Sequence, residues 1–245
     1  SAAPAAKSMR VGLPARKPDA NGRIPLNKMS QAIARRTAQT MREAPLFYLT
    51  VNIDMTRALD FRKELNEALG GDVRVSVNDM IMKACAIALQ KHPVFNSIFK
   101  DDHLVVQPHM NIGMAVALPE GLVVPSVLEC EHKSLVQIAR EAKDVAERAR
   151  SGTLKQEEYT GTFSVSNLGM FDVDEFTAII VSPQVAVLAV GSVRPTPVVR
   201  DNAVAVRQMM QATLSTDHRA ANGAESAQFA VEIKRVLENP LLLTM

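Results

Sequence analysis

Apolar and polar positions follow a helical period first and then change to a strand-like alternation. Ile33, Thr37 and Met41 recur every four residues, which places them on one face of a helix that ends before Pro45. Basic residues occupy other positions of this helix: Arg35, Arg36 and Arg42. Residues 46–55 then alternate between apolar and polar side chains. The pattern predicts an amphipathic helix followed by a half-buried strand.

The same two patterns continue along the rest of the chain. Further helices are predicted at 56–69, capped by Thr56, from Ser76 or Asn78 to residue 92, at 134–150 and at 224–237. Short apolar or β-branched runs predict strands at 104–107, 111–118, 122–128, 162–167, 185–193 and 203–214. Because every apolar face needs a partner layer, we expect an α/β fold in which helices cover a mixed sheet.

Composition narrows the class of protein. The chain has 245 residues, 47% of them hydrophobic, which is enough for one large core. Its 28 basic and 26 acidic residues leave a net charge of +2, so nothing favours a nucleic acid as partner. No apolar run approaches the ~20 residues of a membrane-spanning helix. Cys85 and Cys130 lack metal or redox spacing, and we expect both to be reduced core residues of a cytoplasmic protein.

Residues 1–22 differ from everything that follows. They are rich in Ala, Pro and basic residues and show no periodicity, as is typical of flexible linkers between domains. We therefore expect this segment to be the remnant of an interdomain linker in a larger parent chain, and residues 23–245 to form the folded domain.

The most informative segment lies between the last predicted strand and the last helix. It places His218 between Asp217 and Arg219 and is followed by Asn222-Gly223, in a turn rather than on a packed apolar face. Composition alone favours an exposed turn histidine beside two charges. The remaining histidines show no metal-ligand spacing and are predicted to be surface or capping residues: His92, His103, His109 and His132.

The segment resembles the Asp-His-Arg-x-x-x-Gly signature of dihydrolipoamide acyltransferases, the acyl-carrying cores of 2-oxo acid dehydrogenase complexes. Further matching segments occur in order along the chain, at 24–26, 35–36, 111–116, 121–125 and 161–169. The overall pattern looks most like the bacterial acetyltransferases of pyruvate dehydrogenase complexes. The resemblance implies an acyltransferase catalytic domain over 23–245 and the sandwich fold of chloramphenicol acetyltransferase. Many members carry Asp where this chain has Asn222.

The chemistry of transfer between thiols gives His218 a role. A thiol with a pKa near ~8.5 is a weak nucleophile until a base removes its proton, and histidine is suited to take that proton and return it. Attack on a thioester develops negative charge on oxygen, which requires a hydrogen-bond donor. The resemblance implies that Ser166 is this donor and not a nucleophile. Alternatively, the Ser166 hydroxyl bonds only to backbone.

Three neighbours of His218 have weaker assignments. Asn222 follows it by four residues, so its amide is predicted to act in the site, to cap the last helix, or to do both. Side chains of adjacent residues diverge, so Asp217 and Arg219 are predicted to form structural salt bridges rather than a charge relay.

The resemblance also implies substrates and partners. Coenzyme A and dihydrolipoamide would be substrates, the lipoyl group would be carried by parent-chain domains absent here, and no metal is expected. The family forms trimers that assemble into a hollow core, with Ser166 and His218 contributed by neighbouring chains. The parent chain would recruit the 2-oxo acid dehydrogenase and dihydrolipoamide dehydrogenase components. The tail at 240–243 is predicted to insert between trimers, with packing on its own core as the alternative.

Two other functions remain open from the sequence. One is a shell protein without catalysis, which the presence of both His218 and Ser166 disfavours. The other is acetylation of a small molecule of the chloramphenicol type, which the linker and the long-range motif matches disfavour.

Overall fold

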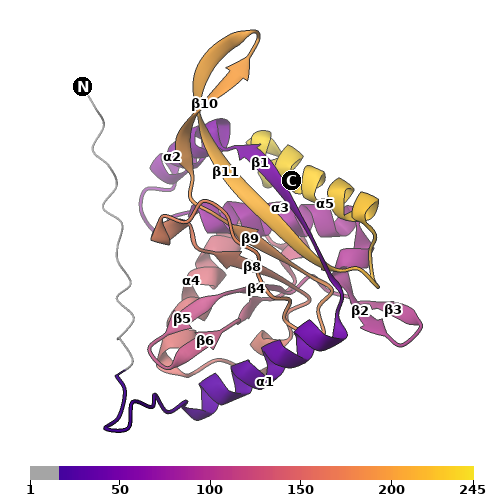
Figure 1. Ribbon diagram of the computed structural model, residues 1–245. Helices are drawn as coiled ribbons and strands as arrows, with labels where there is room; N and C mark the ends of the chain where they lie inside the picture. Colours follow the sequence, from indigo (N-terminus) through magenta and orange to yellow (C-terminus); the bar gives the residue numbers. More distant parts are fainter. Residues whose placement is uncertain (1–16) are drawn as a thin grey trace.

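The computed structural model describes residues 17–245. Most of the predicted linker lies outside this range. Within it, a mixed seven-stranded sheet runs in the order β1-β11-β9-β8-β4-β7, with β10 pairing on β11 (Figure 1). Its strands are β1 (Leu46–Asp54), β4 (Ile112–Met114), β7 (Ser126–Val127), β8 (Phe163–Asn167), β9 (Ala186–Val190), β10 (Arg194–Arg200) and β11 (Ala203–Asp217). Strands β4, β8 and β9 are parallel, and the other pairs are antiparallel. The predicted mixed sheet is confirmed.

Helices alternate with these strands as expected. They are α1 (Lys28–Glu43), α2 (Thr56–Ala68), α3 (Val77–Lys91), α4 (Leu135–Ser151) and α5 (Gly223–Glu238). Small hairpins add β2 (Ser97–Lys100) with β3 (His103–Val106), and β5 (Val116–Leu118) with β6 (Gly121–Val123). The predicted strand at 111–118 is therefore split between two sheets, and so is the one at 122–128. Of the helices in the described part of the chain, none is long and apolar enough to cross a bilayer.

Two predicted helix caps have different outcomes. Ser76 caps α3 by accepting a hydrogen bond from the Asp79 amide, while Asp79 accepts one from the Ser76 amide. The prediction that Thr56 caps α2 is wrong, because Met55 holds the cap position and Thr56 is the first helical residue. The Thr56 hydroxyl instead accepts a hydrogen bond from the amide of Gln208 in β11.

The two faces of the main sheet have opposite character. Phe47, Val51 and Ile53 point to the face that α3 and α5 cover, whereas Thr50 alternates to the other face. This second face is also polar on the neighbouring strand. Thr50 pairs with Thr213 of β11, and their hydroxyls are 2.9 Å apart. One face thus forms the core, and the other presents hydroxyl and amide groups.

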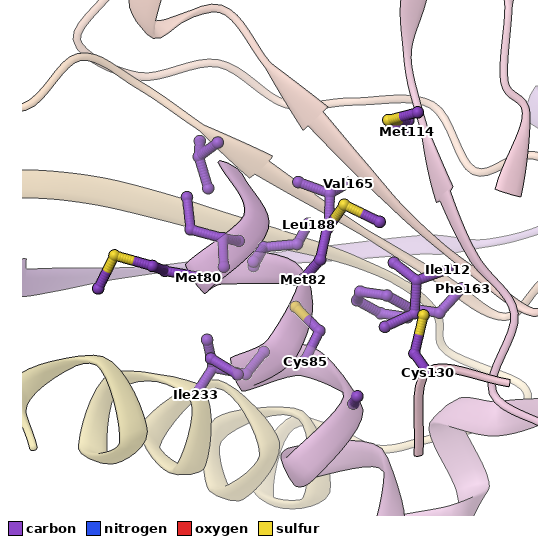
Figure 2. Close-up of a cluster of buried hydrophobic side chains, with 14 of the residues drawn as sticks. Met80, Met82, Cys85, Ile112, Met114, Cys130, Phe163, Val165, Leu188 and Ile233 are labelled. Atoms are coloured by element: carbon purple, nitrogen blue, oxygen red, sulfur yellow. The ribbon is translucent and has the colours of Figure 1, made fainter. Parts of the chain in front are cut away.

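Figure 2 shows the core where α3 and α5 meet the sheet. Its labelled side chains come from α3, from strands β4, β8 and β9, from α5 and from the turn before α4: Met80, Met82, Cys85, Ile112, Met114, Phe163, Val165, Leu188, Ile233 and Cys130. Both cysteines are free and buried, as predicted. Burial raises the pKa of Cys130 to about 12, which makes its thiol unreactive at neutral pH.

The C-terminal tail forms a 3-10 turn, η5 (Pro240–Thr244), after α5. Leu243 is fully buried and Leu242 packs against the core, whereas Leu241 remains 69% exposed. The tail therefore packs largely on its own domain, which was the alternative to insertion between trimers, and leaves one leucine facing outwards.

Candidate active site

His218 lies in the turn that directly follows β11. Its backbone amide donates to the carbonyl of Pro45, which extends the pairing of β11 with β1 by one residue. The imidazole ring meets the edge of Phe47 in a T-shaped contact with 5.4 Å between ring centroids. The side chain is otherwise exposed. The strand end thus fixes the backbone of His218 and leaves its ring open to solvent.

The turn around His218 is held by its two charged neighbours. Asp217 is buried, and its carboxylate accepts hydrogen bonds from the Arg219 backbone amide and from the Arg219 guanidinium, the closest at 2.7 Å. This hydrogen bonding raises the pKa of Arg219, whose guanidinium also lies over the Phe99 ring at 4.3 Å. The predicted structural salt bridge is confirmed. The Asp217 carboxylate is therefore turned towards Arg219.

Asn222 is the N-cap of α5. Its side-chain oxygen accepts hydrogen bonds from the amides of Ala224 and Glu225, at 2.9 and 3.0 Å. Glu225 in turn accepts from the Asn222 amide at 2.9 Å, which completes a capping box. Of the two predicted roles, the structure confirms capping.

Replacing Asn222 with alanine removes this oxygen and leaves two amides of the first turn unpaired. We expect the free energy of unfolding to fall by about 0.5–2 kcal/mol. Denaturant unfolding of the whole chain at fixed concentration measures the change. Asn222→Asp is the matched control, because an aspartate caps as well as an asparagine. Equal stability of all three proteins would contradict the capping role.

Ser166 lies near the end of β8 and is half-buried. In the register it pairs with Ala189 of β9, which pairs with Thr213 of β11, so all three belong to the polar face. Among residues 17–245, the Ser166 hydroxyl makes no hydrogen bond to the chain. That finding disfavours the alternative in which the hydroxyl only bonds to backbone.

The structure does not bring Ser166 and His218 together within one chain. Ser166 is level with Thr213, five residues before His218, which amounts to about 16 Å along β11 at ~3.3 Å per residue. Two strand spacings of ~4.8 Å separate β8 from β11, so the two residues are about 19 Å apart. Phe47, which contacts His218, also belongs to the opposite face of the sheet. A site that uses both residues requires two chains.

A cavity of about 510 Å³ opens on the polar face towards β10, and Ser166 is not among the residues that line it. Asn52 of β1 and its partner Gln211 of β11 line it. Gln211 lies two residues before Thr213, which is the residue of β11 level with Ser166. Ser192 also lines it and donates to the carbonyl of Gly169, in the loop after β8. The face that carries Ser166 therefore has space and hydrogen-bonding groups for a ligand.

The other histidines lie at element ends or on the surface, as predicted. His92 is the C-cap of α3, and His103 is exposed beside Asp102. No spacing in the sequence groups His109 with His132, yet Glu131 lies within 4 Å of both imidazoles. Of the three residues, only Glu131 and His132 are neighbours in the sequence.

Residues 18–245 match the family described as 2-oxoacid dehydrogenases acyltransferase (catalytic domain). One similar protein is the dihydrolipoyllysine-residue acetyltransferase component of the mitochondrial pyruvate dehydrogenase complex of Schizosaccharomyces pombe. It is 41% identical over 222 residues, which cover 89% of this chain and 46% of that protein. The chain spans about half the length of the curated relatives it matches.

Solved structures lead to the same family. The dihydrolipoamide acetyltransferase of Azotobacter vinelandii, studied for the catalytic roles of a serine, a histidine and an asparagine, is 29% identical with a TM-score of 0.87 and full coverage of both chains. The cubic core of a pyruvate dehydrogenase multienzyme complex gives the same values. A chloramphenicol acetyltransferase, 13% identical over 83% of this chain and 94% of its own, has a TM-score of 0.50, which shows a shared fold. The chain belongs to the catalytic-domain family of the 2-oxoacid dehydrogenase acyltransferases.

Proposed function

We propose that the chain transfers an acetyl group between dihydrolipoamide and coenzyme A, with His218 of one subunit and Ser166 of a neighbouring subunit in each site. The separation of about 19 Å within one chain carries this proposal, because residues so far apart act on one thioester only when two chains meet. A trimer in which each chain supplies one histidine and one serine gives three such sites.

The reaction moves one proton and exchanges one carbon–sulfur bond. The unprotonated His218 imidazole takes the proton from the attacking thiol, and the thiolate sulfur bonds to the thioester carbonyl carbon. The Ser166 hydroxyl donates a hydrogen bond to the oxyanion of the tetrahedral intermediate. The carbon–sulfur bond to the leaving thiol then breaks, and the imidazolium returns the proton to that sulfur.

The spacing of the residues supports these roles. In the Azotobacter enzyme, the serine and histidine investigated for catalysis are 52 positions apart, and the asparagine follows the histidine by four. Ser166, His218 and Asn222 have the same spacing. Asn222 would then position the turn that holds His218, since its oxygen already caps α5.

We infer a corresponding assembly. The likeness to a cubic pyruvate dehydrogenase core supports trimers joined into a hollow shell. The 2-oxo acid dehydrogenase and dihydrolipoamide dehydrogenase components would join through other domains of the parent chain, which would also carry the lipoyl group. Two free, buried cysteines fit a reducing compartment such as the cytoplasm.

Mixing two inactive variants tests the shared site. His218→Ala and Ser166→Ala are unfolded together in equal amounts and refolded, so that mixed trimers form. A site is intact only when its histidine comes from a Ser166→Ala chain and its serine from a His218→Ala chain, and random mixing makes this true of about a quarter of the sites. We expect acetyl transfer to recover to about a quarter of the activity of refolded wild type.

Each variant refolded alone is the control and stays inactive. The double variant His218→Ala/Ser166→Ala, refolded with an equal amount of wild type, should also leave about a quarter of the sites intact, because both residues of a site must then come from wild-type chains. No recovery in mixtures that refold to the correct size would contradict a site shared between chains.

A further inference from the structure

We propose that His109, Glu131 and His132 form a binding site for a divalent transition-metal cation such as Zn²⁺. None of the three was assigned a part in acyl transfer. His109 precedes β4, whereas Glu131 and His132 lie in the 3-10 turn η2 (Cys130–His132) before α4. Segments distant in sequence thus supply two imidazoles and a carboxylate to one point on the surface, a set of ligands that suits zinc.

The ligand atoms are already close to a metal geometry. The Nδ1 atom of His109 is 3.1 Å from Oε1 of Glu131, and the Nε2 atom of His132 is 3.7 Å from the same oxygen. One ligand atom from each residue lies within 4.8 Å of the other two. Ligands at ~2.1 Å from a tetrahedral zinc are about 3.4 Å from one another. Small rotations of the two imidazole rings therefore produce three ligand positions around one cation.

The scaffold beneath the three side chains is fixed by hydrogen bonds. The Cys130 amide donates to the Met110 carbonyl at 3.0 Å, and the Glu129 amide donates to the Asn111 side chain at 3.0 Å. These bonds join η2 to the segment that carries His109. The second carboxylate oxygen of Glu131 accepts from the Met110 amide at 2.9 Å, which orients the first oxygen towards the histidines. Such outer contacts hold metal ligands in place.

Charge and exposure also suit a cation. The Glu131 side chain supplies a carboxylate between the two imidazoles and is 9% exposed. His132 is 71% exposed, which leaves room for the cation and for a water molecule as fourth ligand.

Zinc titration of the whole chain tests this site, with a competing fluorescent chelator as the reporter. We expect saturable binding with one zinc ion per chain at this site. His132→Ala and His109→Ala should each weaken it at least about tenfold, as loss of groups around a metal does. With cobalt(II) as the probe, the wild type should show the visible absorption of tetrahedral coordination, and His132→Ala should lose it.

His103→Ala is the matched control, because His103 is an exposed histidine paired with a carboxylate but without a third ligand. It should bind zinc as the wild type does. Glu131→Gln keeps an oxygen for the Met110 amide, so loss of zinc affinity in this variant is not a loss of folding. No saturable zinc binding by the wild type, or equal affinity in His132→Ala, would overturn the proposal.

Discussion

Replacing His218 with alanine is expected to lower the rate of acetyl transfer by about 10²–10⁴-fold, the usual contribution of a general base. Without the imidazole, the attacking thiol must lose its proton to water, and only the small fraction already ionised at neutral pH reacts. Initial rates with acetyl-CoA and free dihydrolipoamide measure the loss. Free dihydrolipoamide is the acceptor, so that the assay requires no lipoyl domain.

The assembled protein should survive this substitution. His218 contributes an edge contact with Phe47, and its backbone bond to Pro45 is available to any residue. Sedimentation before and after the change therefore serves as the control for assembly. His103→Ala, at an exposed histidine outside the proposed active site, should keep full activity. Near-normal turnover in an assembled His218→Ala protein would remove His218 from the role of base.

Local patterns predicted most of the elements that position His218. The strand predicted at 46–55 corresponds to β1, and the strand predicted at 203–214 corresponds to β11. Strand β11 continues to Asp217 and so ends beside His218. Side-chain period and cap residues are properties of neighbouring positions, so they are visible in the chain itself. The turn after β11 was predictable for the same reason.

Strand β10 escaped prediction because it contains Pro195 and Pro197. Proline lacks the amide that a strand within a sheet donates, so two of them in seven residues argue against a strand. The structure accommodates both because β10 pairs only with β11 and forms an edge. Whether a segment lies at an edge is decided by the strand order.

Long-range contacts explain the other differences. Thr56 has a residue type that suits a cap, but its hydroxyl accepts a hydrogen bond from Gln208, 152 positions away. The contact between His109 and Glu131 could not be predicted from local sequence either, because only the packing of η2 brings the two residues together. The separation of Ser166 from His218 likewise depends on the order β11-β9-β8, and local spacing carries no information on it.

Replacing Ser166 with alanine is expected to reduce kcat by about 10²–10³-fold and to change KM little, because an oxyanion donor acts on the transition state more than on bound substrate. The hydroxyl makes no hydrogen bond within residues 17–245, so its removal leaves no partner unpaired in the chain. Steady-state kinetics with both substrates varied separates kcat from KM.

Ser164→Ala is the control for this substitution, since Ser164 lies on the same face of β8 two residues earlier. Its hydroxyl is buried and donates to Gln184 at 2.7 Å, so its loss should lower stability and leave kcat unchanged. Mass spectrometry after incubation with acetyl-CoA should find no acetyl group on Ser166, because the role proposed for this serine is that of a hydrogen-bond donor and not of a nucleophile. A covalent acetyl-serine would contradict the role of donor. An unchanged kcat in Ser166→Ala would make the residue structural, and another donor on the same polar face would then stabilise the oxyanion.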